Sequence, residues 1–166
     1  MAESTRDAIA VNLLESFRKR GLTFAAAESC TGGLVNERLT AIAGSSDVVE
    51  GGVVSYSNNV KVRLLGVKKE TLDTLGAVSE ETARQMAEGV KLATGADIAV
   101  SVTGIAGPGG GSCEKPVGTV CFGCASSKMT KTTTKSFGSD LSRDEIRRLA
   151  SDYALTLATE AAENEA

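Results

Sequence analysis

Residues 23–42 contain a strand, a turn and a helix in succession, and this unit constrains the fold more than any other part of the chain. The run Thr23–Ala27 is short and apolar, which is typical of a buried strand. After the turn a helical pattern follows, with apolar residues at Leu34, Val35, Leu39 and Ile42. The segment Ala27–Gly33 therefore places Ser29 where a strand passes into a helix. The amides of a first helical turn lack internal partners and the helix dipole is positive there, so this position suits an anion or a nucleophile that attacks a carbonyl.

Strand-like and helix-like segments alternate along all 166 residues, which favours an α/β sandwich with helices on both faces of a sheet. Further strands are expected at 48–56, at 97–102, around Cys121 and near 129–137. Helices are expected from a cap at Ser4 to Gly21, over 58–65, from Ser79 to Gly95, and from a capping box at Ser142–Glu145 to Ala158. The last helix is expected to bury a stripe formed by Leu149, Ala150, Tyr153, Ala154, Leu157 and Ala158. With neither a linker nor a repeat, we expect one domain, residues 1–166.

Composition and charge exclude several classes of function. A net charge of -3 lacks the basic excess that nucleic-acid-binding proteins usually show. No apolar run approaches the roughly 18 residues that a membrane span needs. The N-terminal residues lack the basic and then apolar plan of a signal peptide. We therefore expect a cytoplasmic protein without nucleic-acid or membrane partners.

Four cysteines raise the question of a metal site. Cys121 and Cys124 form a C-x-x-C pair, but they fall within an expected strand, where residues three apart point to opposite faces. The chain has no histidine to complete a zinc site. We therefore expect ordinary buried thiols and no bound metal.

The lack of histidine also limits how Ser29 could be activated. If Ser29 is a nucleophile, its base cannot be imidazole, and lysine is the natural substitute. Lys61 is the candidate, although a single lysine on a short helix is more commonly a solvated surface residue. Its pKa would have to fall from about 10.4 to about 7–8, through burial or a cationic neighbour. Ser29 has a simpler interpretation as a helix cap, and Cys30 beside it is an alternative nucleophile.

Several other residues could complete a site. Tyr56 could donate a hydrogen bond to the Ser29–Lys61 pair, or it could be an ordinary half-buried tyrosine. The amides of residues 31–33 could hold a phosphate or an oxyanion, or merely form a turn. The 103–118 segment is glycine-rich but lacks the Gly-Lys-Ser/Thr of a P-loop, so it indicates only a close approach of backbone to a ligand. Arg143 could meet an anion from the first turn of the last helix, or be an ordinary surface arginine.

Taken together, these segments resemble the CinA C-terminal domain family, whose active members are nicotinamide-nucleotide amidases. The resemblance rests on motifs that occur in the family's order and extend roughly from Thr5 to Ala158. The motifs are Ala27–Gly33, Ala43–Ser46, Tyr56–Asn58 with Lys61, Gly76–Ser79, Thr103–Pro108 and Lys115–Thr119. The resemblance implies a three-layer α/β/α sandwich with a mixed, mostly parallel sheet, and oligomers of identical subunits.

The resemblance also implies a reaction. The family hydrolyses the carboxamide of nicotinamide mononucleotide to nicotinic acid mononucleotide and ammonia, without a metal or another cofactor. Its catalytic serine and lysine correspond to Ser29 and Lys61, with Tyr56 in support. The expected substrate-binding residues lie in the motifs and at the start of the last helix: Cys30, Thr31, Gly32, Gly33, Asn58, Thr103, Gly104 and Arg143. The alternative function is a non-catalytic module that binds a pyridine nucleotide.

The sequence leaves two parts of this site open. The chain departs from the family between Phe137 and Arg143, a segment apparently two residues longer than usual, with Ser142 where aspartate is expected. How far Arg143 reaches toward a ligand depends on this segment. The oxyanion would meet backbone amides either near Thr31 or near residues 103–104.

Overall fold

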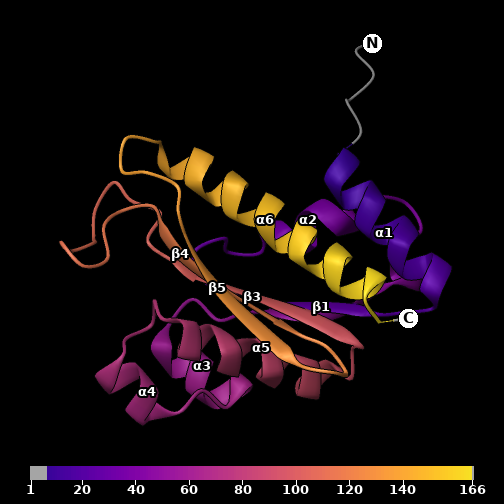
Figure 1. The fold of residues 1–166 in the computed structure, drawn as a ribbon, viewed down its shortest axis with the longest axis horizontal. Helices are drawn as coiled ribbons and strands as arrows, with labels where there is room; N and C mark the ends of the chain where they lie inside the picture. The colour runs from indigo at the N-terminus through magenta and orange to yellow at the C-terminus, as the bar shows by residue number, and fades with distance from the viewer. Residues whose placement is uncertain (1–6, 166) are drawn as a thin grey trace.

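The computed structural model describes residues 7–165, which form one five-stranded sheet between two layers of helices (Figure 1). In chain order the elements are α1 (Ala8–Arg20), β1 (Phe24–Glu28), α2 (Leu34–Thr40), the 3-10 helix η1 (Ser45–Asp47), β2 (Val49–Val54), α3 (Asn58–Leu65), α4 (Lys69–Thr74), α5 (Glu80–Thr94), β3 (Ile98–Gly104), β4 (Thr119–Ala125), β5 (Thr130–Ser136) and α6 (Arg143–Glu163). The predicted α/β/α sandwich is confirmed. None of the helices within residues 7–165 is long and apolar enough to cross a membrane.

The strands of the sheet follow the order β2-β1-β3-β4-β5. β1 lies parallel to both β2 and β3, whereas β4 is antiparallel to β3 and to β5. Of these five strands, four run in one direction and β4 runs in the other, which confirms the predicted mixed, mostly parallel sheet. The threonine- and lysine-rich β5 lies at one edge, where lysine side chains discourage pairing with another chain.

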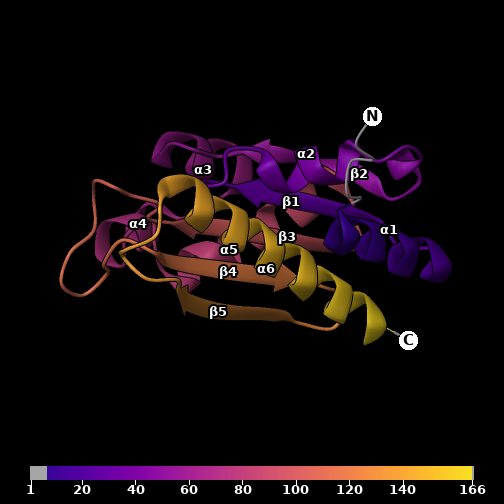
Figure 2. The same cartoon turned by 90° about the horizontal axis from the view of Figure 1, so that it is seen from above.

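Helices cover both faces of the sheet, with α1, α2 and α6 on one face and α3, α4 and α5 on the other (Figures 1 and 2). All five residues of β1 are buried. Their side chains alternate, because Ala26 packs into the core with α1 and α6, whereas Ala25 and Ala27 pack into the core with α3 and α5. The side chains of Ser29 and Cys30 continue this alternation just beyond the strand, so they point to opposite faces.

α3 and α5 begin and end where local capping chemistry predicts, and α6 begins there but continues past the predicted Ala158 to Glu163. α3 covers the predicted residues 58–65. α5 begins after Ser79, whose side chain accepts a hydrogen bond from a first-turn amide, and it ends before Gly95. Ser142 and Glu145 form the predicted capping box at the start of α6. These boundaries follow from short-range hydrogen bonds, which a sequence pattern records directly.

The start of α1 and the whole of α4 differ from the prediction. The predicted cap Ser4 lies outside the described residues, and α1 begins after Asp7, whose carboxylate accepts a hydrogen bond from the Ala10 amide at 3.2 Å. The sequence pattern does not predict α4, because its six residues are too few for an apolar period and no side chain caps it.

The last helix buries a different face from the predicted stripe. Ala150, Ala154 and Ala158 are fully buried against the sheet and its neighbouring helices. The larger members of the predicted stripe are partly buried, and Leu149 is 38% exposed, so the prediction that it is buried is wrong. The buried face also includes Ile146, Ser151, Leu155 and Thr159, so it is rotated around the helix axis relative to the predicted stripe.

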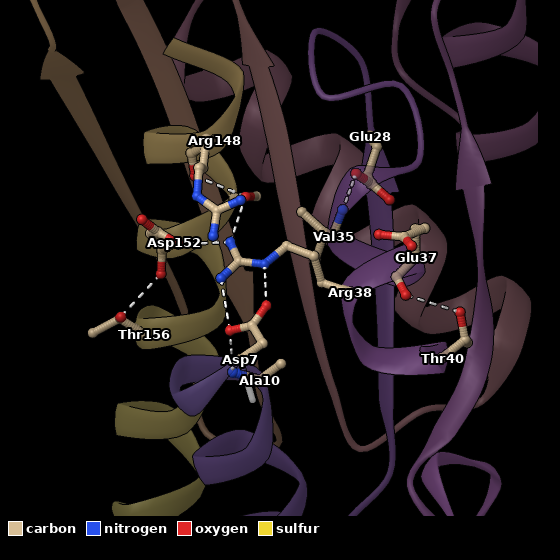
Figure 3. Close-up of polar contacts among 11 residues, drawn as sticks. Asp7, Ala10, Glu28, Val35, Glu37, Arg38, Thr40, Arg148, Asp152 and Thr156 are labelled. Carbon is tan, nitrogen blue, oxygen red and sulfur yellow. Dashed lines mark hydrogen bonds and ion pairs between the residues drawn. The ribbon is translucent and has the colours of Figure 1, made fainter. Parts of the chain in front are cut away.

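A cluster of charged side chains joins α1, α2 and α6 (Figure 3). Arg38 of α2 is buried, and its Nε and Nη2 donate to the Asp7 carboxylate at 2.6 and 2.9 Å. Its Nη1 donates to the Asp152 carboxylate and to the Ser151 hydroxyl, both at 2.6 Å. The hydrogen bonds from Arg38 lower the pKa of Asp7, so this carboxylate stays charged well below neutral pH.

Candidate active site

The carboxyl ends of the three mutually parallel strands meet at one edge of the sheet. Ser29 follows β1, Ser55 and Tyr56 follow β2, and Thr103 and Gly104 end β3. The chain leaves β1 through α2 on one face of the sheet and leaves β2 through α3 on the other (Figure 1). In open α/β sheets, ligands bind in the crevice that such a change of face creates at the carboxyl ends of the strands.

A pocket of about 300 Å³ lies at this edge. Eight of the eleven predicted site residues line it: Ser29, Cys30, Tyr56, Asn58, Lys61, Thr103, Gly104 and Arg143. The rest of its lining comes from residues 77–78 before α5 and from the 105–111 loop. Thr31, Gly32 and Gly33 are not part of the lining.

The side chains of Ser29 and Lys61 meet at the floor of this pocket. Lys61 Nζ lies 3.1 Å from Ser29 Oγ, and it also donates to the carbonyls of Ser55 at 2.9 Å and Tyr56 at 3.3 Å. The Lys61 side chain is 1% exposed, so the interpretation as a solvated surface lysine is wrong. Within residues 7–165 no carboxylate pairs with Lys61. Burial consequently lowers the pKa of Lys61, which favours the neutral amine that can accept a proton.

Helix α3 turns Lys61 inward because of where the helix begins. The Ser57 side chain accepts a hydrogen bond from the Val60 amide and so determines the first turn. Lys61 lies four residues before Leu65, which is buried among the apolar residues between α3, α5 and the sheet. Residues four apart lie on one face of a helix, so the packing that buries Leu65 also turns Lys61 toward the sheet.

Cys30 lines the pocket next to Ser29, but its thiol belongs to the other side of the sheet. It packs into the core beneath α1 and α6. Burial raises the pKa of the Cys30 thiol to about 12. Since the thiolate and not the thiol is the nucleophile, this environment favours Ser29 over Cys30 as the attacking group.

Arg143 reaches the pocket despite the altered segment that precedes it. Its Nη1 donates to the Gly107 carbonyl at 2.7 Å and its Nη2 donates to the Tyr56 hydroxyl at 3.3 Å. The Tyr56 side chain is 62% exposed rather than half-buried, and its hydroxyl bonds Arg143 instead of the Ser29–Lys61 pair. Arg143 thereby connects the start of α6 with the loop at Gly107 and with Tyr56 after β2, and its guanidinium lies at the rim of the pocket.

The end of β3 forms the opposite wall. Thr103 Oγ1 donates to the Ala77 carbonyl at 2.7 Å, which holds the segment before α5 against the strand. A Cβ on Gly104 would lie 2.7 Å from Val120 and 2.9 Å from the Thr119 carbonyl, so no larger residue fits there without a shift. The long loop between β3 and β4 is held in place by a hydrogen bond that Lys115 Nζ donates to the Leu75 carbonyl at 2.7 Å.

Residues 6–162 match the family model of the CinA C-terminal domain. The chain belongs to the CinA C-terminal domain family. A CinA-like protein of Kosmotoga olearia is 50% identical over 155 residues, which cover 93% of this chain and 36% of that protein. A CinA-like protein of Chlorobaculum tepidum is 58% identical over 125 residues, which cover 75% of this chain and 29% of that protein. The chain thus spans about a third of the length of these relatives.

Solved structures agree with the family and with the fold. The competence/damage inducible protein CihA from Agrobacterium tumefaciens is 45% identical, with a TM-score of 0.90 over 94% of each chain. The competence damage-inducible protein A (ComA) from Klebsiella pneumoniae is 34% identical, with a TM-score of 0.90 over 95% of this chain and 97% of that one. The resemblance that the sequence motifs carry is therefore confirmed at the level of family and architecture.

The residue before the serine closes the turn in this CinA domain, and sequence reasoning missed it. The Glu28 carboxylate accepts a hydrogen bond from the Val35 amide at 2.7 Å (Figure 3). It accepts a second one from the Asn36 amide at 3.2 Å. α2 begins only at Leu34, so the interpretation of Ser29 as its cap is wrong. Because Glu28 already occupies the free amides of α2, they are not available to a ligand anion. The sequence does contain a signal for this role, because Glu28 is the single acidic residue in an otherwise apolar strand.

The glycines of the CinA motif shape the same turn rather than the pocket. Gly32 and Gly33 adopt φ values of 58° and 109°, in the left-handed region that favours glycine. Arg147 of α6, a second residue that sequence reasoning missed, donates to the carbonyls of Cys30 and Thr31. The Thr31 hydroxyl is buried and has no hydrogen-bond partner among residues 7–165.

The two strand cysteines of this CinA domain lie as predicted on opposite faces of β4. Cys124 packs with the core beneath α6, where its sulfur lies 3.9 Å from the Leu157 carbonyl. The Cys121 sulfur instead contacts the Thr134 hydroxyl at 3.4 Å. No group of three metal-ligating side chains occurs in the described part of the chain.

Proposed function

We propose that this CinA domain hydrolyses the carboxamide of nicotinamide mononucleotide to nicotinic acid mononucleotide and ammonia. The observation that carries the proposal is the 3.1 Å contact between Ser29 Oγ and the buried, carboxylate-free amine of Lys61. An alcohol is a weak nucleophile unless a base takes its proton, and a lysine with a lowered pKa can be that base. The family resemblance supplies the substrate.

In the first half of the reaction, Ser29 Oγ attacks the carboxamide carbon and its proton passes to Lys61 Nζ. The carbonyl oxygen becomes an oxyanion, which needs preorganised hydrogen-bond donors. As the carbon–nitrogen bond breaks, Lys61 returns the proton to the leaving nitrogen and ammonia departs. An ester between Ser29 and the nicotinoyl group remains.

In the second half, water attacks the ester carbon and gives a proton to the neutral Lys61. The carbon–oxygen bond to Ser29 breaks, and Lys61 returns the proton to the serine oxygen. The carboxylic acid product ionises and leaves. Because Lys61 both accepts and donates a proton in each half, the scheme requires a pKa nearer to neutrality than that of a free lysine.

The phosphate of the substrate is assigned to Arg143 and to the glycine-rich loop opposite it. Arg143 presents a guanidinium at the pocket rim, and guanidinium binds phosphate through two parallel hydrogen bonds. Gly109, Gly110 and Gly111 line the same pocket, so backbone can approach the anion closely. The ring and its carboxamide would then lie toward Ser29.

The proposal is tested by measuring ammonia release from nicotinamide mononucleotide in a coupled assay. The wild-type protein should release one ammonia per nicotinic acid mononucleotide formed. Ser29→Ala should reduce the rate at least about 10³-fold, because a nucleophile removed from a serine hydrolase is not replaced by its neighbours. Cys30→Ala is the matched control and should keep most of the activity. Full activity in purified Ser29→Ala would end the proposal.

The alternative is a non-catalytic module that binds a pyridine nucleotide. One observation favours it: only 36% and 29% of two curated relatives match this chain, so in them the domain accompanies another region. Saturable binding of nicotinamide mononucleotide to the wild-type protein without ammonia release would support the module and exclude the amidase.

A further inference from the structure

Two charged side chains hold the turn Ser29–Gly33 without lining the pocket. Glu28 binds the first amides of α2 on the far side of the turn. Arg147 of α6 lies one helical turn after Arg143 and contacts the turn itself. The side chains of Glu28 and Arg147 are not part of the pocket lining.

Arg147 binds two consecutive peptide groups of the turn. Its Nε donates to the Cys30 carbonyl at 3.1 Å and its Nη2 donates to the Thr31 carbonyl at 3.0 Å. A planar guanidinium with two such bonds determines the orientation of both carbonyls. In a trans peptide the N–H points opposite to the C=O, so the Thr31 amide is directed away from α6. α6 and the Lys61-bearing helix α3 cover opposite faces of the sheet (Figures 1 and 2).

Some backbone amides of the turn donate hydrogen bonds within the protein, and others do not. The Ser29 amide donates to the Val102 carbonyl at 2.9 Å, and the Gly32 amide donates to the Ser29 carbonyl at 3.0 Å. Among residues 7–165, no backbone or side-chain oxygen accepts a hydrogen bond from the amides of Cys30 and Thr31. Two free donors therefore lie directly after the candidate nucleophile, and Cys30 is part of the pocket lining. A buried amide without a partner is costly, so a bound oxygen atom would be favoured there.

We propose that Arg147 is a positioning residue for an oxyanion site formed by the amides of Cys30 and Thr31. The inference rests on the proposed amidase function and decides between the two oxyanion positions that the sequence leaves open. Arg147 holds the Cys30 carbonyl and so directly orients the Thr31 amide, which belongs to the same peptide. It also holds the Thr31 carbonyl, whose peptide carries the Gly32 amide; that amide donates to the Ser29 carbonyl and so orients the Cys30 amide on the other side of the Ser29–Cys30 peptide. Both amides are therefore already oriented when negative charge develops on the substrate oxygen. A cation on the Cys30 carbonyl also polarises that peptide and strengthens the Thr31 amide as a donor.

The test compares Arg147→Ala and Arg147→Lys with Arg84→Ala, a matched control on α5 whose arginine pairs with Glu81 and Glu88 away from the pocket. Loss of one oxyanion donor typically lowers kcat 10²–10³-fold, so we expect Arg147→Ala to lower kcat about 10²-fold. KM and the pH midpoint of the rate should stay unchanged, because neither substrate contacts nor Lys61 are altered. Lysine should restore little, since one ammonium cannot orient two carbonyls, whereas added guanidinium ion should partly rescue Arg147→Ala.

A second readout does not depend on the nicotinamide substrate. A fluorophosphonate probe reacts with an activated serine by displacing fluoride, and it uses the oxyanion donors but no phosphate or ring site. Labelling of Ser29 should be slow in Arg147→Ala and normal in Arg84→Ala, with melting temperatures that show both variants to be folded. Wild-type labelling and kcat in Arg147→Ala would overturn the proposal, as would a wild-type Ser29 that does not label at all. A wild-type protein that labels but releases no ammonia would overturn the proposed substrate, and the labelling rates would still decide the role of Arg147.

Discussion

Arg38 and Lys61 are the two basic side chains that lie buried among residues 7–165, and their surroundings are opposite in kind. Arg38 lies between the carboxylates of Asp7 and Asp152 (Figure 3). Burial opposes its charge, but the hydrogen bonds to these carboxylates prevail and raise the pKa of Arg38. Lys61 has carbonyls and a serine hydroxyl around it, and burial lowers its pKa.

The difference separates a structural cation from the cation that we propose as the catalytic base. A buried charge that is paired and hydrogen-bonded holds helices together, and its protonation does not change near neutral pH. A buried amine without a counterion loses its proton more easily, and perturbed pKa values of this kind gather at functional sites. The two residues also lie on opposite faces of the sheet, so each can be altered without touching the other. The following experiments use that separation.

The largest effect is expected from Lys61→Met, which keeps the length and burial of the side chain but removes the amine. Loss of a general base typically costs 10²–10⁴-fold, so ammonia release should fall about 10³-fold. The melting temperature should stay close to that of the wild type, because removal of an unpaired buried amine offsets the loss of its hydrogen bonds to the carbonyls of Ser55 and Tyr56. Lys69→Met on α4, where the side chain is exposed, is the matched control. Wild-type turnover in Lys61→Met would remove Lys61 from the mechanism.

Arg38→Met should show the reverse pattern, with stability lost and chemistry kept. Removal of one partner from a buried ion pair costs about 3–5 kcal/mol, and we expect about 3 kcal/mol because both aspartates retain some contact with water. Urea unfolding measures the change, and kcat of the folded variant should match the wild type. Arg18→Met, which breaks an exposed pair with Asp47, should cost less than about 1 kcal/mol. Equal stability of Arg38→Met and the wild type would contradict the structural role.

The pH dependence of the reaction should follow Lys61. Its pKa lies below the ordinary 10.5, so the neutral, reactive amine accumulates as pH rises and kcat/KM should increase about tenfold per pH unit until that pKa is passed. The free energy of unfolding should also rise with pH. Between the lowered pKa and 10.5, the unfolded chain binds more protons at Lys61 than the folded chain does. The stability of the wild type relative to Lys61→Met should therefore increase as pH rises through this range. A rate that falls with pH over this range would be incompatible with a lysine base.

The smallest effect is expected from Thr31→Val. The Thr31 hydroxyl is buried without a partner among the described residues, and valine has nearly the same shape. Removing an unsatisfied buried hydroxyl should leave the free energy of unfolding unchanged or raise it by up to about 1 kcal/mol. Turnover should be unchanged, because the backbone amide of residue 31 remains. A large loss of turnover at normal stability would show that the hydroxyl, and not the amide, takes part.

The outcome of the sequence predictions differs between neighbouring residues of the same motif. Ser29 and Lys61 follow from the absence of histidine together with the family motifs, and the structure brings these two side chains into contact. Thr31, Gly32 and Gly33 belong to the same motif, yet they form the turn and not the pocket lining. Arg147 meets Cys30 across more than a hundred residues of chain, and no local pattern records such a contact.

By itself, the sequence determined the local elements and the kinds of chemistry available: capped helices, a serine at a strand end, a lysine in place of histidine, and the family to which they belong. These properties depend on hydrogen bonds and periodicities within a few residues. Only the tertiary structure decided that Lys61 is buried without a counterion, that the Cys30 thiol belongs to the opposite core, and that Arg147 reaches the serine turn. Burial and electrostatic environment arise from the packing of distant segments, so they become visible only when the chain is folded.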